Sequence, residues 1–221
     1  MKKKLYNDLV EKRKRHIFPE GLSNPVNLNY DCSEIGAWTQ WQGNLDAKIL
    51  VIGQDWGDVN YFNDNKGKDR DDNPTNKNLK NLFCQLGFDI GLPNNPVKQP
   101  IFFTNAILGI KGDSQKKQMS GSVKTSWIKD SNDHFTKELI SIIQPKIIIT
   151  LGAMPLYAMK LLYSKSISSE KLGILIDKNP IQLEKGIQLF AFYHCGGLGL
   201  ANRKLENQLK DWQKAKSIIN P

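Results

Sequence analysis

The chain is poor in residues that hold metals: its 221 residues include only three cysteines and three histidines. These form no CxxC pair, no ladder of cysteine and histidine and no HExxH sequence. We therefore expect no structural zinc, no iron–sulfur cluster and no metal at the active site. A sparse, odd number of cysteines is also typical of proteins in a reducing cytosol.

Long apolar segments are missing as well. No run of the sequence approaches the roughly 18 apolar residues of a membrane helix. The lysine-rich segment 1–10 lacks the apolar core of a signal peptide. The sequence therefore predicts a soluble, cytoplasmic protein with no membrane partner, associated with the nucleoid if its partner is DNA.

Acidic residues are outnumbered, with 22 Asp and Glu against 31 Lys and Arg, a net charge of +9. Such a charge suits a polyanionic partner, because neutralising phosphates releases counterions. The abundance of Lys, Asn and Ile explains the positive charge too, so charge favours nucleic acid without establishing it.

The length of the chain suits one hydrophobic core. We expect a monomer, with an N-terminal helix and loop (residues 1–46) packed on a single α/β domain (residues 47–221).

Apolar, β-branched runs alternate with segments of helical spacing along the chain. The predicted strands are residues 48–53, 101–104, 146–151 and 187–193, the last in a hairpin with 181–183. The predicted helices are residues 5–15, 75–86, 132–144, 152–163 and 200–218. This alternation predicts a three-layer α/β/α fold with a central, mainly parallel four-stranded sheet. Polar residues 58–74 read as a long surface loop, and so do residues 109–126.

Three of the predicted strands end in polar groups: Asp55, Asn105 and His194. Because ligands bind outside the carboxyl ends of parallel strands, we expect these groups to meet in one crevice. Cleaving a base from its sugar needs a carboxylate near the cationic sugar and hydrogen-bond donors near the departing base. Each residue also has a structural interpretation, as a cap, an Asx turn or a structural histidine.

The order of these motifs resembles the uracil-DNA glycosylase superfamily. Gly53-Gln54-Asp55 is similar to the start of the motif Gly-Gln-Asp-Pro-Tyr, and Phe103-Thr104-Asn105-Ala106 to the strand end that reads uracil. His194-Cys195-Gly196-Gly197-Leu198 looks like a diverged His-Pro-Ser-Pro-Leu segment. The resemblance spans residues 48–212 and implies a uracil-DNA glycosylase-like fold and a monofunctional DNA glycosylase. Such an enzyme releases uracil or a related altered base and leaves an abasic site, without a cofactor.

The resemblance also implies roles for particular residues. Asp55 would assist water attack on the sugar, and His194 would donate to a base carbonyl. The base-binding candidates are Gly53, Gln54, Trp56 and Asn105, with Tyr61 or Phe62 as the stacking aromatic. The DNA-contacting candidates are Gly196, Gly197, the wedge Leu198, Arg203, Lys204 and Lys111. Lys111 lies in the lysine-rich loop 109–126, where solvated lysines are as good an explanation as phosphate contacts.

Departures from the family pattern leave alternatives open. Trp56-Gly57 stands where the family has Pro-Tyr, so the tyrosine that blocks a 5-methyl group is missing and a bulkier pyrimidine or another base becomes possible. The last motif lacks Pro and Ser, so a catalytically silent nucleic-acid-binding module with the same fold is the main alternative. Residues 197–202 follow a strand and open a helix, as the glycine-rich loop of a dinucleotide-binding enzyme does. No later strand is present to carry the acidic residue that binds the ribose, which counts against such an enzyme. Cys195 is a poor nucleophile partner for its neighbour His194, because adjacent side chains in extended backbone point apart.

Overall fold

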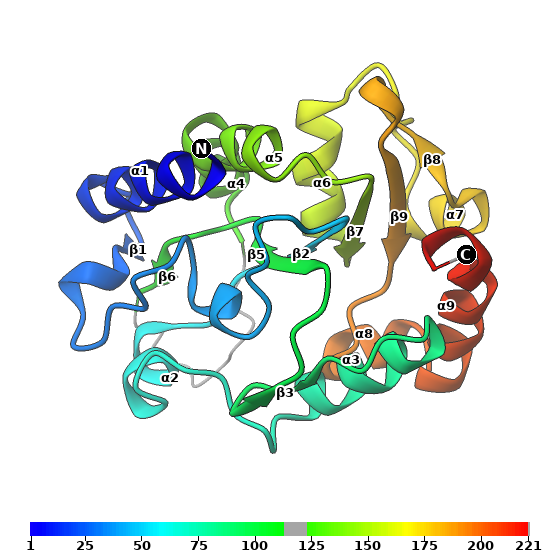
Figure 1. Ribbon diagram of the computed structural model, residues 1–221, viewed down its shortest axis with the longest axis horizontal. Helices are drawn as coiled ribbons and strands as arrows, with labels where there is room; N and C mark the ends of the chain where they lie inside the picture. The colour runs from blue at the N-terminus through cyan, green and yellow to red at the C-terminus, as the bar shows by residue number, and fades with distance from the viewer. Residues whose placement is uncertain (113–122, 221) are drawn as a thin grey trace.

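The computed structural model describes residues 1–112 and 123–220, and its centre is a five-stranded sheet in a mixed α/β fold (Figure 1). The strand order is β5-β2-β7-β9-β8. The strands are β2 (Ile49–Gly53), β5 (Ile101–Asn105), β7 (Ile147–Leu151), β8 (Ile181–Gln182) and β9 (Gln188–Phe192). The first four in this order are parallel, and β8 joins β9 antiparallel. The four predicted parallel strands are therefore confirmed, and the predicted hairpin adds a fifth strand at the edge.

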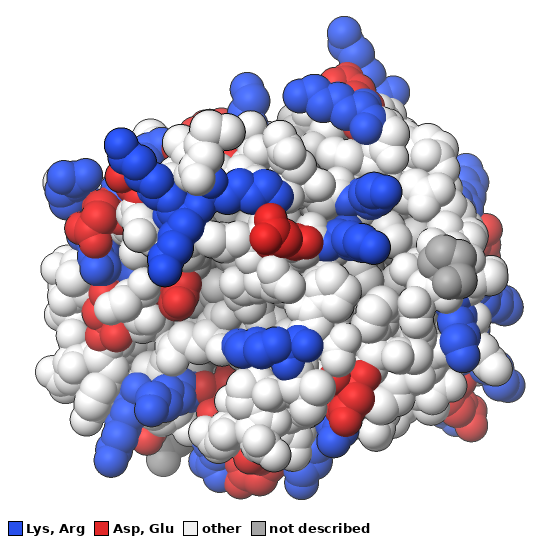
Figure 2. Space-filling view, in the orientation of Figure 1, with Lys and Arg blue, Asp and Glu red and all other residues white. Residues whose placement is uncertain are grey.

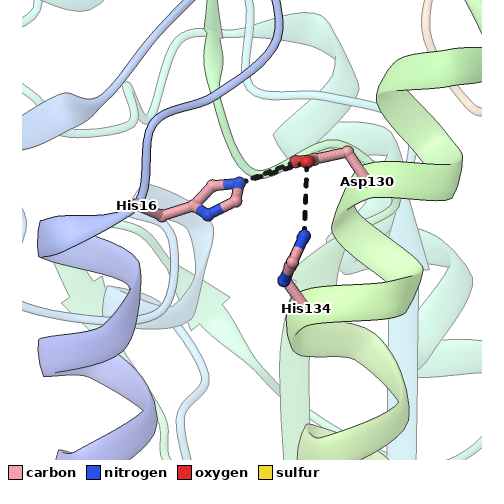
Figure 3. Close-up of side chains that lie close together, drawn as sticks. All are labelled: His16, Asp130 and His134. Atoms are coloured by element: carbon pink, nitrogen blue, oxygen red, sulfur yellow. Dashed lines mark hydrogen bonds and ion pairs between the residues drawn. The ribbon is translucent and has the colours of Figure 1, made fainter.

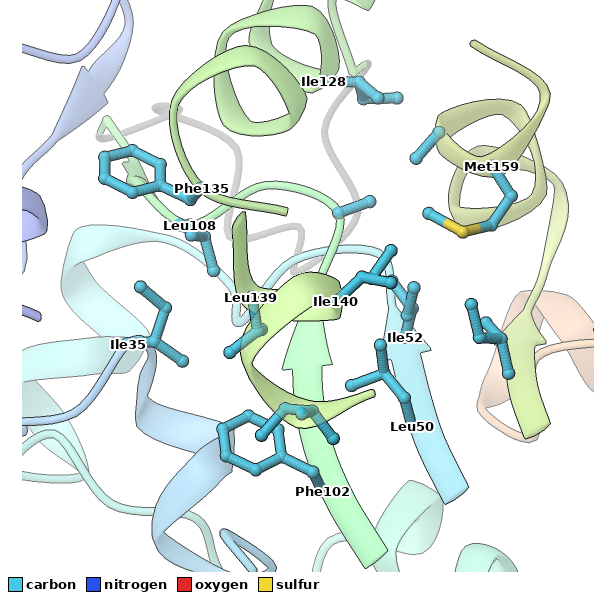
Figure 4. Close-up of a cluster of buried hydrophobic side chains, with 14 of the residues drawn as sticks. Ile35, Leu50, Ile52, Phe102, Leu108, Ile128, Phe135, Leu139, Ile140 and Met159 are labelled. Atoms are coloured by element: carbon cyan, nitrogen blue, oxygen red, sulfur yellow. The ribbon is translucent and has the colours of Figure 1, made fainter. Parts of the chain in front are cut away.

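Helices cover both faces of this sheet, because each parallel strand buries side chains on both sides. Leu50 and Ile52 of β2 join a core with helices at the top of Figure 1, part of which is drawn in Figure 4. Those helices are α1 (Lys2–Arg15), α4 (Thr125–Ser131), α5 (Lys137–Ile143) and α6 (Ala153–Leu162). Ile49 and Val51 join a second core with the helices at the bottom. These are α2 (Val59–Asp64), α3 (Pro74–Gln85) and α9 (Leu205–Ile219).

The remaining elements are short. Two further helices are α7 (Leu172–Leu175) and α8 (Gly197–Asn202). Two small antiparallel ribbons pair β1 (Leu22–Ser23) with β6 (Ile110–Lys111) and β3 (Gly91–Leu92) with β4 (Asn95–Pro96). The 3₁₀ turns are η1 (Pro25–Asn27), η2 (Ala37–Gln40), η4 (Ile176–Lys178) and η5 (Glu184–Gly186), and η3 (Asn132–Thr136) is a π-helix between α4 and α5. Along residues 1–112 and 123–220, no helix has both the length and the apolarity needed to cross a membrane.

Local interactions shift some boundaries from those the sequence predicts. The loop predicted at 58–74 contains helix α2, because the Asp58 side chain caps the Tyr61 N–H at 2.8 Å and Phe62 is buried. The predicted helix 200–218 is two helices, α8 and α9, separated at Arg203, whose backbone is extended. Of the predicted loop 109–126, β6 and the start of α4 occupy the ends, and residues 113–122 lie outside the described part.

The N-terminal helix α1 packs against α5 and contributes Tyr6, Leu9 and Val10 to the first core. The last turn of α1 carries four basic residues, Lys12 to Arg15, and one of them, Arg13, is fully buried. The Arg13 guanidinium donates to Asp31 Oδ1 at 2.8 Å and to a backbone carbonyl at 2.6 Å. Arg13 therefore fastens the following segment to α1, and its place in the interior rules out a contact with nucleic acid.

Candidate active site

The carboxyl ends of β2, β5 and β9 meet at one edge of the sheet, and the three polar groups predicted there lie at that edge. Gly53 and Asn105 are register partners at the last position of β2 and β5. A Cβ at position 53 would stand 2.6 Å from the Asn105 Oδ1, so only glycine lets this amide lie across the strand end. His194 follows β9, and the Asp55 charge acts on its ring. The structure therefore places all three residues at the carboxyl-terminal edge of the parallel strands.

Asp55 accepts hydrogen bonds on both carboxylate oxygens. The Gly57 N–H donates to Oδ1 at 3.0 Å, which forms an Asx turn after β2, and the Gln54 amide donates to Oδ2 at 2.8 Å. The Lys111 ammonium lies 3.0 Å from Oδ1. Only 4% of the Asp55 side chain is exposed, so its charge acts in a largely desolvated position.

Lys111 occupies a different place from the one the sequence predicts. Its side chain is 7% exposed and ion-paired to Asp55, instead of standing in solvent along a phosphate backbone. Strand β6 positions it: the Lys111 N–H donates to the Gly57 carbonyl at 3.3 Å, which ties β6 to the turn after Asp55. The prediction that Lys111 contacts DNA through a solvated loop is therefore corrected. Sequence reasoning could not find the pair, because 55 residues of chain separate its two members and periodicity does not indicate which charged side chains meet.

His194 is held in one protonation state by its surroundings. Burial lowers the pKa of the imidazole below its usual value, and the nearby Asp55 charge offsets this only in part. The Gly196 N–H donates to Nδ1 at 3.0 Å, so the proton of the neutral ring is assigned to Nε2. His194 is therefore a neutral donor through Nε2 near pH 7.

The backbone around His194 depends on close approach by α8. A Cβ at position 199 would lie 1.7 Å from the His194 carbonyl oxygen, so Gly199 is required there. Gly196 is buried between His194 and Thr75, and its N–H already serves the imidazole. This corrects the expectation that Gly196 contacts DNA. Gly197 and Leu198, by contrast, project outward, and the Leu198 side chain is 68% exposed.

The two cations predicted to follow this loop differ from each other. Arg203 forms a two-pronged pair with Asp211, with its NH2 group 2.6 Å from Oδ1, which braces the break between α8 and α9. The pairing uses Nε and Nη2, and the Arg203 side chain is 31% exposed, so its predicted contact with DNA stays a prediction. Lys204 is exposed at the start of α9 and stays a candidate DNA contact.

The aromatic side chains near the site are arranged differently from the prediction. Phe62 is fully buried beneath Trp56, with ring centroids 5.3 Å apart, so it has no face for a base. Tyr61 is partly exposed and lies beside Trp56, which is itself buried. Trp38 of η2 was missed: it lies within 2.9 Å of a Cβ position on Gly53, against the same strand end as Asn105. The only sequence signal was a tryptophan-rich stretch in the N-terminal segment.

Two side chains limit other chemistry at the site. Cys195 is fully buried, burial raises its pKa to about 12, and its Sγ lies 3.4 Å from the Thr75 carbonyl oxygen. Cys195 is therefore no nucleophile, as its position beside His194 predicts.

Asp69 was not singled out from the sequence, and burial raises its pKa to about 6. Its charge also acts on Tyr61, so it belongs to the wall behind the aromatic residues.

The outer surface carries its basic groups among acidic ones. On the face shown in Figure 2, lysine and arginine side chains are spread between aspartate and glutamate, and several gather over α1. Part of that cluster is paired within the protein, since Lys12 contacts Glu138 at 2.9 Å and Lys14 contacts Glu11 at 2.9 Å. The net positive charge is thus distributed over the surface shown.

Comparisons of this chain with models of known protein families and with curated proteins find no match.

Proposed function

We propose that this protein is a DNA glycosylase of the uracil-DNA glycosylase superfamily, with the fold of that superfamily. It would hydrolyse the bond between deoxyribose and uracil, or a related altered base, and leave an abasic site. The observation that carries the proposal is the meeting of Asp55, Asn105 and His194 at one sheet edge, with His194 held as a neutral Nε2 donor. A carboxylate, an amide and an imidazole are the groups this reaction needs.

Each group has a separate task in the proposed reaction. The bond between sugar and base breaks with positive charge on the sugar and negative charge on the base. Asp55 stabilises the cationic sugar and orients the attacking water. The neutral His194 donates from Nε2 to a base carbonyl oxygen as charge develops there. Asn105 offers one donor and one acceptor in a plane, which matches the amide-like edge of a pyrimidine.

The substrate must leave its duplex to reach these groups. Flipping one nucleotide out of a duplex costs on the order of a few kcal/mol. A side chain that fills the gap left in the base stack offsets part of that cost. Leu198 supports this step, because it follows His194 by four residues and is 68% exposed on α8. Tyr61, which is partly exposed beside Trp56, is the aromatic candidate to contact the extruded base. Gly57 in place of a blocking tyrosine favours substrates larger than uracil, such as 5-substituted pyrimidines.

A second candidate function has one observation in its favour. Both Asp55 oxygens are engaged, and Lys111 lies 3.0 Å from one of them. Oδ1 has two of these partners and Oδ2 has one, so the attacking water must use the remaining acceptor site of Oδ2 in a position that is only 4% exposed. If no water reaches that site, the protein is a nucleic-acid-binding module that extrudes or holds a base without cleaving it. The two functions differ in a single outcome, the presence or absence of an abasic site.

The deciding experiment uses oligonucleotides that each carry one altered base, including uracil, 5-substituted uracils and hypoxanthine, in DNA and in RNA. The protein is incubated with each, and alkali-labile breaks are scored on a denaturing gel. We expect breaks at one class of altered base in DNA. His194→Asn should lower turnover by about 10²- to 10³-fold, the usual cost of one lost donor to a developing anion.

Asp55→Asn should lower turnover further while leaving binding of the oligonucleotide largely intact. The matched control is Asp46→Asn. It changes an 86% exposed carboxylate near the N-terminal end of β2, opposite the site, and should leave turnover unchanged. Binding without breaks, for every base tested, would favour the silent module. Undiminished breakage by Asp55→Asn would exclude the proposed role of that residue.

A further inference from the structure

Two of the three histidines in the chain meet at one carboxylate, away from the candidate active site. His16 follows the last residue of α1, Asp130 lies in α4, and His134 lies four residues later in η3. Figure 3 shows both rings turning a nitrogen toward Asp130. One ligand atom from each residue lies within 4.8 Å of the other two. Segments more than 110 residues apart in sequence thus bring three metal-ligating groups together.

Hydrogen bonding explains only half of this arrangement. His16 Nε2 lies 3.0 Å and 3.2 Å from the two Asp130 oxygens, which is a good hydrogen bond. His134 Nε2 lies 3.8 Å from Oδ1, beyond hydrogen-bond distance, although it points at the same carboxylate. The two imidazoles are also close together, with ring centroids 4.6 Å apart. A cation between the three groups would give the second ring the partner that the hydrogen bond does not.

The distances fit a small divalent cation. Zinc binds imidazole nitrogen and carboxylate oxygen at about 2.0–2.2 Å, so neighbouring ligand atoms in a tetrahedral site stand roughly 3.3–3.5 Å apart. Asp130 oxygens lie 3.0 Å from His16 Nε2 and 3.8 Å from His134 Nε2, on both sides of that value, and the ligand atoms of the two rings are at most 4.8 Å apart. Converting the cluster into a metal site therefore requires only small side-chain movements.

The surroundings suit such a site as well. The edges of Phe18 and Phe135 pack against the His16 ring at centroid distances of 4.7 and 5.0 Å, which fixes its orientation. Apolar walls strengthen metal–ligand attraction by excluding water. His134 is 48% exposed, which leaves a route for the ion and a place for a water as fourth ligand. Imidazole ligands favour zinc and its first-row neighbours, whereas magnesium and calcium prefer oxygen.

We propose that His16, Asp130 and His134 bind one transition-metal ion, with Zn²⁺ the best match. The ion fastens the end of α1 to the junction of α4 and η3. His16 lies against Phe135 of the first core, whereas the candidate active site lies over the second core, so the role is structural and independent of the proposed glycosylase reaction. Because the ion would bind the folded protein and not the unfolded chain, the stability of the protein should rise with the ion concentration.

The test titrates the full chain, stripped with a chelator, with ZnCl₂ in a calorimeter. A Cys84→Ser background removes an exposed thiol that could bind zinc by itself. We expect one equivalent of Zn²⁺ and a melting temperature that rises with zinc concentration. His134→Ala and Asp130→Asn should each weaken binding by at least about tenfold, since changes even to groups behind the ligands cost that much.

Glu138→Gln is the matched control, because it removes a neighbouring half-exposed carboxylate that pairs with Lys12 and is outside the cluster. It should bind zinc with unchanged affinity. Absence of stoichiometric binding would overturn the proposal, and so would equal affinity in His134→Ala, whose partly exposed position allows folding to be checked by circular dichroism. Equally strong binding of MgCl₂ would overturn the choice of a transition metal.

Discussion

Replacing Lys111 with methionine should destabilise the protein by about 3 to 5 kcal/mol, because it leaves a buried carboxylate without its cation. The Asp55 and Lys111 side chains are only 4% and 7% exposed, with Nζ 3.0 Å from Oδ1. At that separation the attraction is ~5 kcal/mol with an effective dielectric constant of about 20. Gly57 and Gln54 still donate to Asp55, so we expect a value near 3 kcal/mol, or roughly a 10 °C lower melting temperature.

A double-mutant cycle isolates the pair. Lys111 has a further interaction besides this one, so its single replacement measures more than the ion pair. The cycle compares Asp55→Asn, Lys111→Met and the double variant by urea unfolding followed by circular dichroism at pH 7 and low salt. The double variant should be less destabilised than the sum of the singles, with a coupling energy of about 2 to 3 kcal/mol.

The exposed pair Lys12–Glu138 is the matched control. Its atoms are 2.9 Å apart, but its side chains are 45% and 47% exposed. The same cycle there should give a coupling below about 1 kcal/mol, because water and salt screen the charges. Equal coupling at the two pairs, or additivity within about 0.5 kcal/mol at Asp55–Lys111, would refute the reasoning that burial makes this pair strong.

The remaining predictions concern the site and its partner. Leu198→Ala should reduce base release from duplex DNA more than from single strands, since only the duplex needs a wedge; equal losses would argue against one. Burial lowers the pKa of His194 and its neutral ring is the proposed donor, so base release should persist as the pH falls past the ordinary histidine pKa and decline only on further acidification, and His194→Gln should lack that decline. Burial raises the pKa of Asp69 to about 6, above its unfolded value of 3.8, so the stability this group contributes is present below pH 4 and lost as pH rises through 6. Asp69→Asn should therefore stabilise the protein at pH 8, by up to ~3 kcal/mol, and not at pH 4; thermal unfolding at the two pH values measures this. Binding to DNA should weaken steeply with added salt, and a flat response in a fluorescence titration would count against phosphate contacts.

The strands were predictable because they are buried on both faces. Residues 48–53, 101–104, 146–151 and 187–193 are apolar and β-branched, and each became a strand of the sheet. The position of Asp55, Asn105 and His194 followed from the general rule that parallel strands end at one edge. Helix α2 was less visible, because one capping side chain, Asp58, and one buried ring, Phe62, form it within a polar segment.

The amino-acid sequence by itself determined the alternation of strands and helices, the parallel sheet and the three polar groups at its edge, because periodicity and strand ends are local properties. Only the tertiary structure decided which charges are paired. Lys111 turned inward to Asp55, Arg203 to Asp211 and Arg13 to Asp31, while Trp38 came from the N-terminal segment to the end of β2. A charged side chain has no period in sequence, and whether it meets solvent or a buried partner depends on segments that folding brings from elsewhere.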